Sequence, residues 1–253
     1  MAEQKAHRGL DANLLKLIAI AAMTADHIAW LLFPGYATGA LPVTLHIIGR
    51  ITCPIMCFFI AEGFHYTHDR KKYALRLLAL AVVSHFAYLF ASNSYVDWHS
   101  FIPFYYGDLL NQTGVVWSLL GGLLMLWLCE DEERGMGVKV AGVLLICLVT
   151  LPADWSCIAA LCVLSIGSNR GNPQKQIAWC LFYVAIYAVV YFFALDKLYG
   201  LLQLGVVLAI PLLALYNGKR GKNQTVNRVM KWLFYIYYPL HLAIIGLVQL
   251  QIR

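Results

Sequence analysis

The stretch NLLKLIAIAAMTADHIAWLLF, from Asn13 to Phe33, decides the fold of this chain. It is long enough to cross a bilayer, because a membrane-spanning helix needs about 20 mostly apolar residues. Within it, Asp26 and His27 stand side by side. Ionisable side chains inside a span are costly and usually face the interior of a helix bundle, so this pair indicates a functional position.

The composition of the 253 residues extends this argument to the whole chain. Hydrophobic residues make up 61% and charged residues 13%, whereas about a quarter of an average soluble domain is charged. We therefore predict an all-α, polytopic helical membrane protein with about nine transmembrane helices. The predicted spans are 13–33, 43–64, 73–92, 114–129, 137–152, 155–168, 176–195, 199–216 and 229–250.

Basic residues separate onto two sides when the connections between these spans alternate across the membrane. One side carries nearly all Lys and Arg, and the other carries only Lys197 and Arg253. Because cytoplasmic loops hold the excess of basic residues, the N-terminus is predicted to be cytoplasmic.

The organisation expected is a single integral membrane domain over 1–253. Residues 1–12 form a predicted cytoplasmic N-terminal tail, and no removable signal peptide is expected. The segment 93–112 is a predicted outer interfacial connection whose Trp98, Tyr105 and Tyr106 suit the headgroup level. A role of this segment in recognising an acceptor is the alternative.

Five ionisable residues in the predicted spans share similar depth. They are Asp26, His27, Arg50, His85 and His241. With a rise of 1.5 Å per residue, all fall within about two helical turns of one plane, which predicts a shared polar chamber. Structural alternatives are an Asp26–Arg50 ion pair, a satisfied core histidine at His85 and an interhelical hydrogen bond at His241.

Two prolines lie beside this predicted chamber. Pro54 frees the carbonyl of Arg50, and Pro239 frees that of Tyr235, because proline has no N–H to donate. Broken helices at membrane depth are tolerated where they line a protein cavity. The prolines therefore favour a cavity at this level.

Two further groups lie near the predicted cytoplasmic side. Glu62, His65 and His68 have the spacing of one helical face, yet a solvated helix end explains them better than a metal site. The basic cluster has two interpretations, attraction to anionic lipid headgroups or binding of a phosphorylated cytosolic cofactor. It comprises Arg70, Lys71, Lys72 and Arg76.

Four segments resemble the successive signatures of the TraX family. They are LLKLIAIAAMTADHIAWL (14–31), IGRITCPIMCFFIAEGF (48–64), KYALRLLALAVVSHFAYLF (72–90) and YYPLHLAIIGL (237–247). The resemblance covers nearly the whole chain in order. It implies a bacterial inner-membrane enzyme that moves an acetyl group from cytosolic acetyl-CoA, as co-substrate, to an acceptor near the outer side. The acceptor would be a pilin-type N-terminal amine, a glycan or a lipid.

The family motifs suggest a role for each matching residue. His27 is the expected base, and His241 is the second candidate for base or acetyl carrier. Asp26 would bias the protonation of His27, and Arg50 would stabilise an oxyanion or hold Asp26 ionised. Supporting roles are expected for His85, Tyr88 and Tyr238. The residues expected to hold the phosphates of acetyl-CoA are Arg70, Lys71, Lys72, Arg76 and Arg220.

Two other function classes fit the same residues. A secondary transporter or flippase also binds its substrate at the midplane on broken helices, although no internal repeat is visible. A non-catalytic membrane assembly protein would use Asp26, Arg50 and the histidines only to join helices. Turnover of acetyl-CoA would discriminate the enzyme from both.

Overall fold

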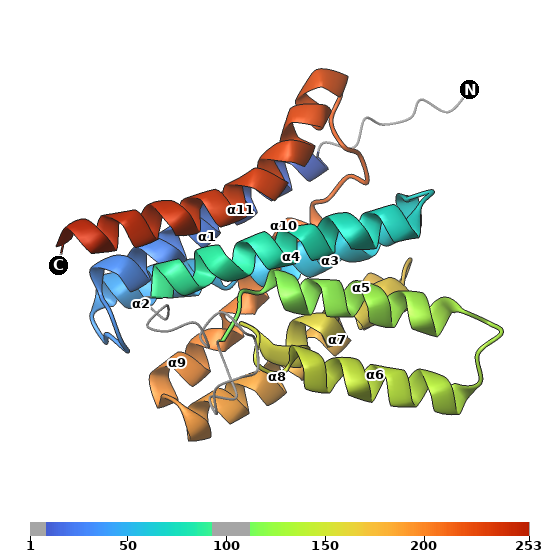
Figure 1. Ribbon diagram of the computed structural model, residues 1–253, viewed down its shortest axis with the longest axis horizontal. Coiled ribbons are helices and arrows are strands. Elements are labelled where there is room, and N and C mark those ends of the chain that lie inside the picture. Colours follow the sequence, from blue (N-terminus) through green and yellow to red (C-terminus); the bar gives the residue numbers. More distant parts are fainter. Residues whose placement is uncertain (1–8, 93–111, 253) are drawn as a thin grey trace.

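A computed structural model describes residues 9–92 and 112–252, and in these ranges the chain is helical with no strand (Figure 1). The all-α class predicted from the sequence is therefore confirmed. Residues 1–8 of the predicted tail and residues 93–111 of the predicted outer connection lie outside the described residues. The elements are α1 (Ala12–Leu32), α2 (Ala40–Gly49), α3 (Thr52–Tyr66), α4 (Arg70–Ser92), α5 (Val116–Glu130), α6 (Met136–Thr150), α7 (Ser156–Ser168), α8 (Pro173–Ala194), α9 (Lys197–Leu202), η2 (Gln203–Leu208), α10 (Ala209–Ala214) and α11 (Gln224–Ile252).

The described helices make this a multi-pass membrane protein. Six segments are long and apolar enough to cross a membrane: Ala12–Leu32, Ala40–Tyr66, Arg70–Ser92, Pro173–Ala194, Lys197–Ala214 and Gln224–Ile252. The predicted spans 114–129, 137–152 and 155–168 coincide with the shorter apolar helices α5, α6 and α7. α5 and α6 have 15 residues each and α7 has 13, fewer than the about 20 that a straight membrane span needs.

Two spans are broken, and one proline-containing helix is not. The second span divides at Arg50 and Ile51, just before Pro54, into α2 and α3. The span Lys197–Ala214 consists of α9, the 3-10 helix η2 and α10. In contrast, α11 continues through Pro239, so the expected break there is absent.

Local sequence explains where several helices begin. The carboxylate of Asp11 accepts a hydrogen bond from the Leu14 N–H at the start of α1, and Asp196 caps α9 in the same way. Asn172 caps α8, whose first residue is Pro173. These side chains satisfy N–H groups that have no partner within the helix.

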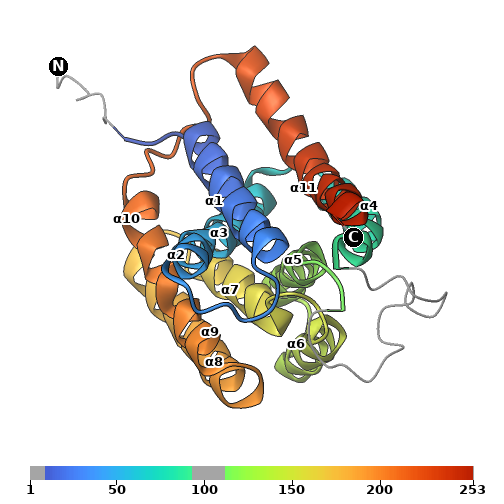
Figure 2. The ribbon, with the colours of Figure 1, turned by 90° about the vertical axis from the view of Figure 1, so that its left-hand side faces the viewer.

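The helices form one bundle in which α1 packs between α2, α3 and α11 (Figure 2). α11 packs along α4, and α7 lies among α3, α5 and α8. Large apolar side chains such as Leu75, Leu148 and Phe193 are exposed on the outside, as expected where a bilayer covers the surface.

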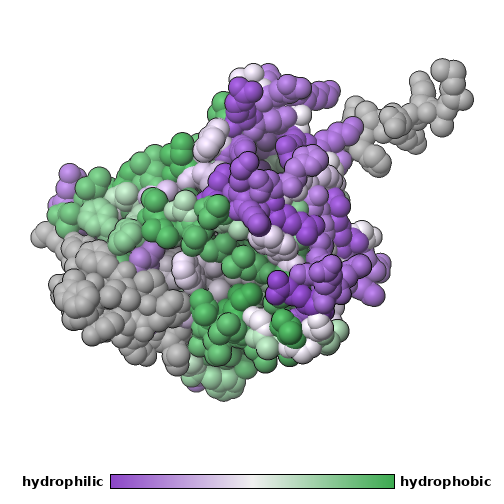
Figure 3. Space-filling model, turned by 45° about the vertical axis from the view of Figure 1, so that its right-hand side comes forward, coloured by the Kyte–Doolittle hydropathy of each residue, from purple (hydrophilic) through white to green (hydrophobic). Residues whose placement is uncertain are grey.

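Polar residues gather at one end of the bundle, which Figure 3 shows as a hydrophilic face beside the N-terminal ends of α1 and α11. We call this the basic end and define it by Lys16, Arg76, Arg220 and Lys231. The opposite end is defined by Pro34, Gly35 and Tyr36, which follow α1.

Close contact between α1 and α2 depends on Gly49. A Cβ atom built at Gly49 would overlap the side chain of Asp26. We expect Gly49→Ala to lower the free energy of unfolding by about 1–3 kcal/mol, the usual cost of overpacking. Gly137→Ala is the matched control, because a Cβ at that position of α6 meets nothing within 4 Å. Thermal unfolding of both variants in nanodiscs measures the difference; equal midpoints would contradict the tight contact.

Candidate functional site

A cavity of about 920 Å³ runs through the bundle from the basic end to the opposite end. Lys16, Arg76, Arg220 and Lys231 line it at the basic end, and Pro34, Gly35 and Tyr36 line it at the other. Asp26, His27 and Arg50 lie on its wall between them. The volume is at the upper end of the range for small-molecule sites, about 300–1,000 Å³.

His27 of α1 and His241 of α11 form a hydrogen-bonded pair. Nδ1 of His27 lies 2.6 Å from Nε2 of His241, and the two rings are nearly parallel with centroids 4.8 Å apart. Nδ1 of His241 lies 2.9 Å from the carbonyl oxygen of Tyr237. A carbonyl only accepts hydrogen bonds, so this Nδ1 carries a proton.

The tautomers of the neutral pair follow from that carbonyl. With its proton on Nδ1, His241 accepts at Nε2, and the donor is therefore the Nδ1–H of His27. This leaves a lone pair on Nε2 of His27, which makes no hydrogen bond within the described ranges 9–92 and 112–252. Since His27 lines the cavity, the pair presents a base to whatever occupies it.

Tyr237 braces the histidine pair from the side of α11. Its ring stacks on His241 with centroids 5.1 Å apart. The Thr24 hydroxyl donates to the Ile20 carbonyl at 2.7 Å, so the Tyr237 hydroxyl, 2.5 Å away, donates to Thr24. α1 and α11 are thus joined twice at this level.

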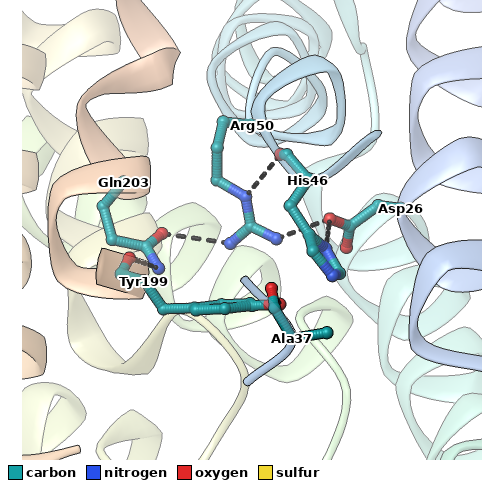
Figure 4. A network of polar contacts seen from close by, with 6 residues as sticks. All are labelled: Asp26, Ala37, His46, Arg50, Tyr199 and Gln203. Carbon is teal, nitrogen blue, oxygen red and sulfur yellow. Dashed lines mark hydrogen bonds and ion pairs between the residues drawn. The ribbon is translucent and has the colours of Figure 1, made fainter. Parts of the chain in front are cut away.

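Asp26 belongs to a second polar cluster on the other side of α1 (Figure 4). Its Oδ1 accepts from Nη2 of Arg50 at 2.7 Å and lies 2.8 Å from Nδ1 of His46. Arg50 also donates through Nη1 to Gln203 at 3.0 Å and through Nε to the His46 carbonyl at 3.2 Å. The predicted Asp26–Arg50 ion pair is therefore present.

The cluster continues through Gln203 to the connection after α1. Nε2 of Gln203 donates to the Tyr199 carbonyl at 3.1 Å, and the Tyr199 hydroxyl donates to the Ala37 carbonyl at the same distance (Figure 4). His46 is 1% exposed, and its Nε2 has no partner in the part of the chain that the structure describes. These contacts fasten α1, α2, α9 and η2 together.

Asp26 and His27, which are adjacent in the sequence, thus face different helices. Asp26 contacts α2, whereas His27 contacts α11. Successive residues on a helix do not face each other, and the hydrogen-bond partner of His27 is His241 rather than Asp26.

The other residues singled out in the sequence lie in several places. Tyr88 and Tyr238 line the cavity, and the ring of Tyr238 meets His241 edge to face at 5.5 Å. His85 is buried with Nδ1 3.0 Å from the Thr113 hydroxyl and is not part of the cavity wall. This contact fits the core-histidine interpretation of His85.

The four residues of the basic cluster that follows α3 lie in two places, one on the cavity wall and three on the surface. Arg76 lines the cavity with Arg220. Arg70 pairs with Glu130 at 3.1 Å, and Lys72 pairs with Asp69 on the surface, while Lys71 is exposed. Arg70, Lys71 and Lys72 therefore lie outside the cavity.

The acidic and histidine residues of the predicted helix end also have separate neighbours. Glu62 pairs with Arg170 at 3.2 Å, and His65 lies 3.5 Å from Glu130. His68 is exposed. Among the described residues no group of His, Cys, Asp and Glu is arranged to hold a metal ion.

Sequence reasoning missed five residues of the site. His46 stands four residues before Arg50, a spacing that puts both on one face of a helix. Lys16 and Lys231 lie within predicted spans, and each offered the same signal as the ionisable residues already singled out. No local sequence pattern indicated Gln203 or Asp154, because only the tertiary fold brings these two residues to the site.

Comparison with known proteins gives one full-length relative and a family. The TraX family, described as "TraX protein", matches residues 11–249. Probable fimbrial assembly protein FimC, serogroup H1, of Dichelobacter nodosus is 26% identical over 249 residues, 94% of this chain and 96% of the relative. An uncharacterized protein of Rickettsia prowazekii (strain Madrid E) is 40% identical over 60 residues, 24% of this chain and 21% of that protein. No solved structure matches. Since the family match spans nearly every described helix, the chain belongs to the TraX family.

Proposed function

We propose that this protein is a membrane-embedded acyltransferase that moves an acetyl group from acetyl-CoA, bound at the basic end, to an acceptor that arrives from the opposite end. The observation that carries the proposal is the lone pair of His27 Nε2 on the wall of a cavity lined at both ends of the bundle. An imidazole held in one tautomer by a hydrogen bond at its other nitrogen is a suitable general base.

The basic end suits the phosphates of coenzyme A. Lys16, Arg76, Arg220 and Lys231 line the cavity there, and none forms an ion pair with an acidic residue in the described ranges. Nε of Arg76 is buried without a hydrogen-bond partner in the same ranges. Unpaired Lys and Arg side chains bind phosphate groups well, so these residues would hold the co-substrate.

The transfer step needs one base and one acid. The acceptor nitrogen or oxygen attacks the thioester carbonyl carbon while His27 Nε2 takes its proton. The carbon–sulfur bond then breaks, and the thiolate of coenzyme A recovers that proton from His27. His241 keeps Nδ1 of His27 engaged throughout, and the Arg50 guanidinium faces the same cavity, where it stabilises the negative charge that develops on the carbonyl oxygen.

The relative and the family favour an acceptor from a surface filament. The relative's name describes a fimbrial assembly protein, and the resemblance to pilin acetylases implies a pilin-type subunit with a free N-terminal amine. With the basic end cytoplasmic, the protein would lie in the bacterial inner membrane, and the acceptor would approach from outside.

The direct test is turnover of radiolabelled acetyl-CoA by purified protein in proteoliposomes. We expect release of free coenzyme A, accelerated by an added amine acceptor. Uptake of a solute without acetyl-CoA turnover would support the transporter alternative. The absence of both activities, in a protein that still supports filament assembly in cells, would support the assembly alternative.

A double substitution at the basic end tests the position of the co-substrate. We expect Lys16→Gln with Arg220→Gln to raise KM for acetyl-CoA about tenfold or more with kcat little changed, because each charge-assisted hydrogen bond contributes about 1.5–3 kcal/mol. Lys72→Gln is the control, since Lys72 pairs with Asp69 on the surface. Steady-state kinetics measures both variants. An effect of Lys72→Gln alone would indicate that acetyl-CoA binds at the surface residues Arg70, Lys71 and Lys72 instead.

A further inference from the structure

Asp154 stands on a strained turn between α6 and α7. Trp155 and Ser156, the two residues after it, have φ of 63° and 49°, in the left-handed region that non-glycine residues rarely adopt. Residues in this region are strained and persist where surrounding contacts hold them. Here Asp154 N–H donates to Thr113 O at 2.7 Å, and Ser118 donates to Ser156 O at 2.6 Å.

The strained turn keeps the Asp154 carboxylate off the helix that follows. Trp155 occupies the N-cap position of α7, and no side chain caps this helix. Asp residues at such positions usually accept from the first N–H groups of a helix. Asp154 instead lines the cavity, where its carboxylate accepts from the backbone N–H of Trp155 and forms no ion pair within 4 Å in the ranges 9–92 and 112–252.

Asp154 and Asp26 are two carboxylates that share the influence of one guanidinium, that of Arg50. Arg50 lies within electrostatic range of both Asp154 and Asp26, but its hydrogen-bonded partner is Asp26, at 2.7 Å. The Asp26–Arg50 pair is neutral in sum. The Asp154 carboxylate therefore gives this part of the cavity a net negative charge and attracts a cation from outside the protein.

Aromatic rings cover the same part of the cavity wall. Trp155 and Tyr187 stack with centroids 5.6 Å apart, and Tyr187 meets Tyr191 at 5.7 Å. Tyr191 meets Tyr36, at the opposite end of the bundle, at 6.3 Å. All four line the cavity. Aromatic faces attract ammonium groups through their negative π surfaces, so the wall and the carboxylate favour the same kind of ligand.

We propose that Asp154 binds the acceptor as an ammonium ion at the aromatic part of the cavity and makes the enzyme select charged acceptors over neutral ones of the same shape. This inference rests on the proposed function. The ammonium group pairs with Asp154, loses a proton to bulk water, and then attacks the thioester as the neutral amine while His27 takes the second proton.

The same carboxylate also favours release of the product. Acetylation converts an ammonium group into a neutral amide, which has no charge to pair with Asp154. The attraction that brings the acceptor in therefore ends once the acetyl group has been transferred.

The test compares two probes of one shape, propylammonium and 1-propanol, in nanodiscs without acetyl-CoA. Ligand-observed NMR gives the two dissociation constants. We expect the wild type to bind propylammonium at least tenfold more tightly than 1-propanol. Asp154→Asn is expected to abolish this preference, and Asp154→Glu, which keeps the charge, to retain it. Asp131→Asn, which removes an exposed carboxylate paired with Arg134, serves as the control.

Three results would overturn the role of Asp154: a wild type without preference, a preference that survives Asp154→Asn, or equal weakening of both probes in that variant. If Asp154→Asn does not fold, Asp154→Ser takes its place in the same comparison. Because no acetyl-CoA is present, the outcome is separate from the proposed function. A charge preference in a protein that turns over no acetyl-CoA would support the cation site at Asp154 and contradict the proposed transferase activity.

Discussion

Replacing His27 with Gln is expected to lower the rate of acetyl transfer by about 10²–10⁴-fold, the usual contribution of a general base. Gln is close in size and can still hydrogen-bond Nε2 of His241, but it has no basic lone pair. The variant should therefore fold and bind acetyl-CoA with an unchanged KM. Single-turnover transfer of radiolabelled acetyl in proteoliposomes measures the effect.

His241→Gln should act more weakly, because His241 orients His27 and does not touch the substrate in the proposed mechanism. We expect the rate of acetyl transfer to fall about tenfold, similar to the loss that follows removal of a residue that orients a histidine ligand in a metalloenzyme. His68→Gln is the control, since His68 is exposed and away from the cavity. Full activity of His27→Gln, with His241→Gln inactive, would exchange the roles of the two histidines.

Replacing Arg50 with Met is expected to lower the free energy of unfolding by about 3–5 kcal/mol, the cost of removing one partner of a buried ion pair. The variant leaves Asp26 charged without its cation and Gln203 without a donor. Adding Asp26→Asn should recover part of this loss, since the second substitution removes the unpaired charge. Unfolding of all variants in SDS and mixed micelles measures these differences.

An exposed pair of equal length gives the matched control for Arg50. Arg134 and Asp131 also lie 2.7 Å apart, but both side chains are substantially exposed. Surface pairs contribute about 0–1 kcal/mol, so Arg134→Met should be close to neutral. A similar cost for both arginines would mean that water reaches the Asp26–Arg50 pair as freely as the surface pair.

The sequence predicts the helices well because the bilayer allows few alternatives. In hydrocarbon each backbone polar group needs an internal partner, so an apolar block such as 13–33 becomes one helix, α1. The span 199–216 shows the limit of this rule, since it forms three short pieces. Gly205 lies against Arg50 there, and this tertiary contact is invisible in an apolar pattern.

The site is predictable only in part, because depth in the membrane says nothing about rotation around a helix. The four residues predicted to share a chamber form two pairs, Asp26 with Arg50 and His27 with His241, on different sides of α1. Asp26, His27 and Arg50 line one cavity, whereas His241 lies behind His27 and is not part of its wall. His85 has similar depth but faces Thr113 instead. The direction that each residue faces depends on packing between segments as far apart in sequence as α1 and α11.

The break between α2 and α3 has an electrostatic consequence for the cavity. Arg50 is the C-cap of α2, where aligned peptide dipoles leave about half a negative elementary charge on the last carbonyls. Its guanidinium bonds one of these, the His46 carbonyl. The positive charge that Arg50 presents to the cavity is thus held at this helix end by hydrogen bonds to α1, α2 and η2.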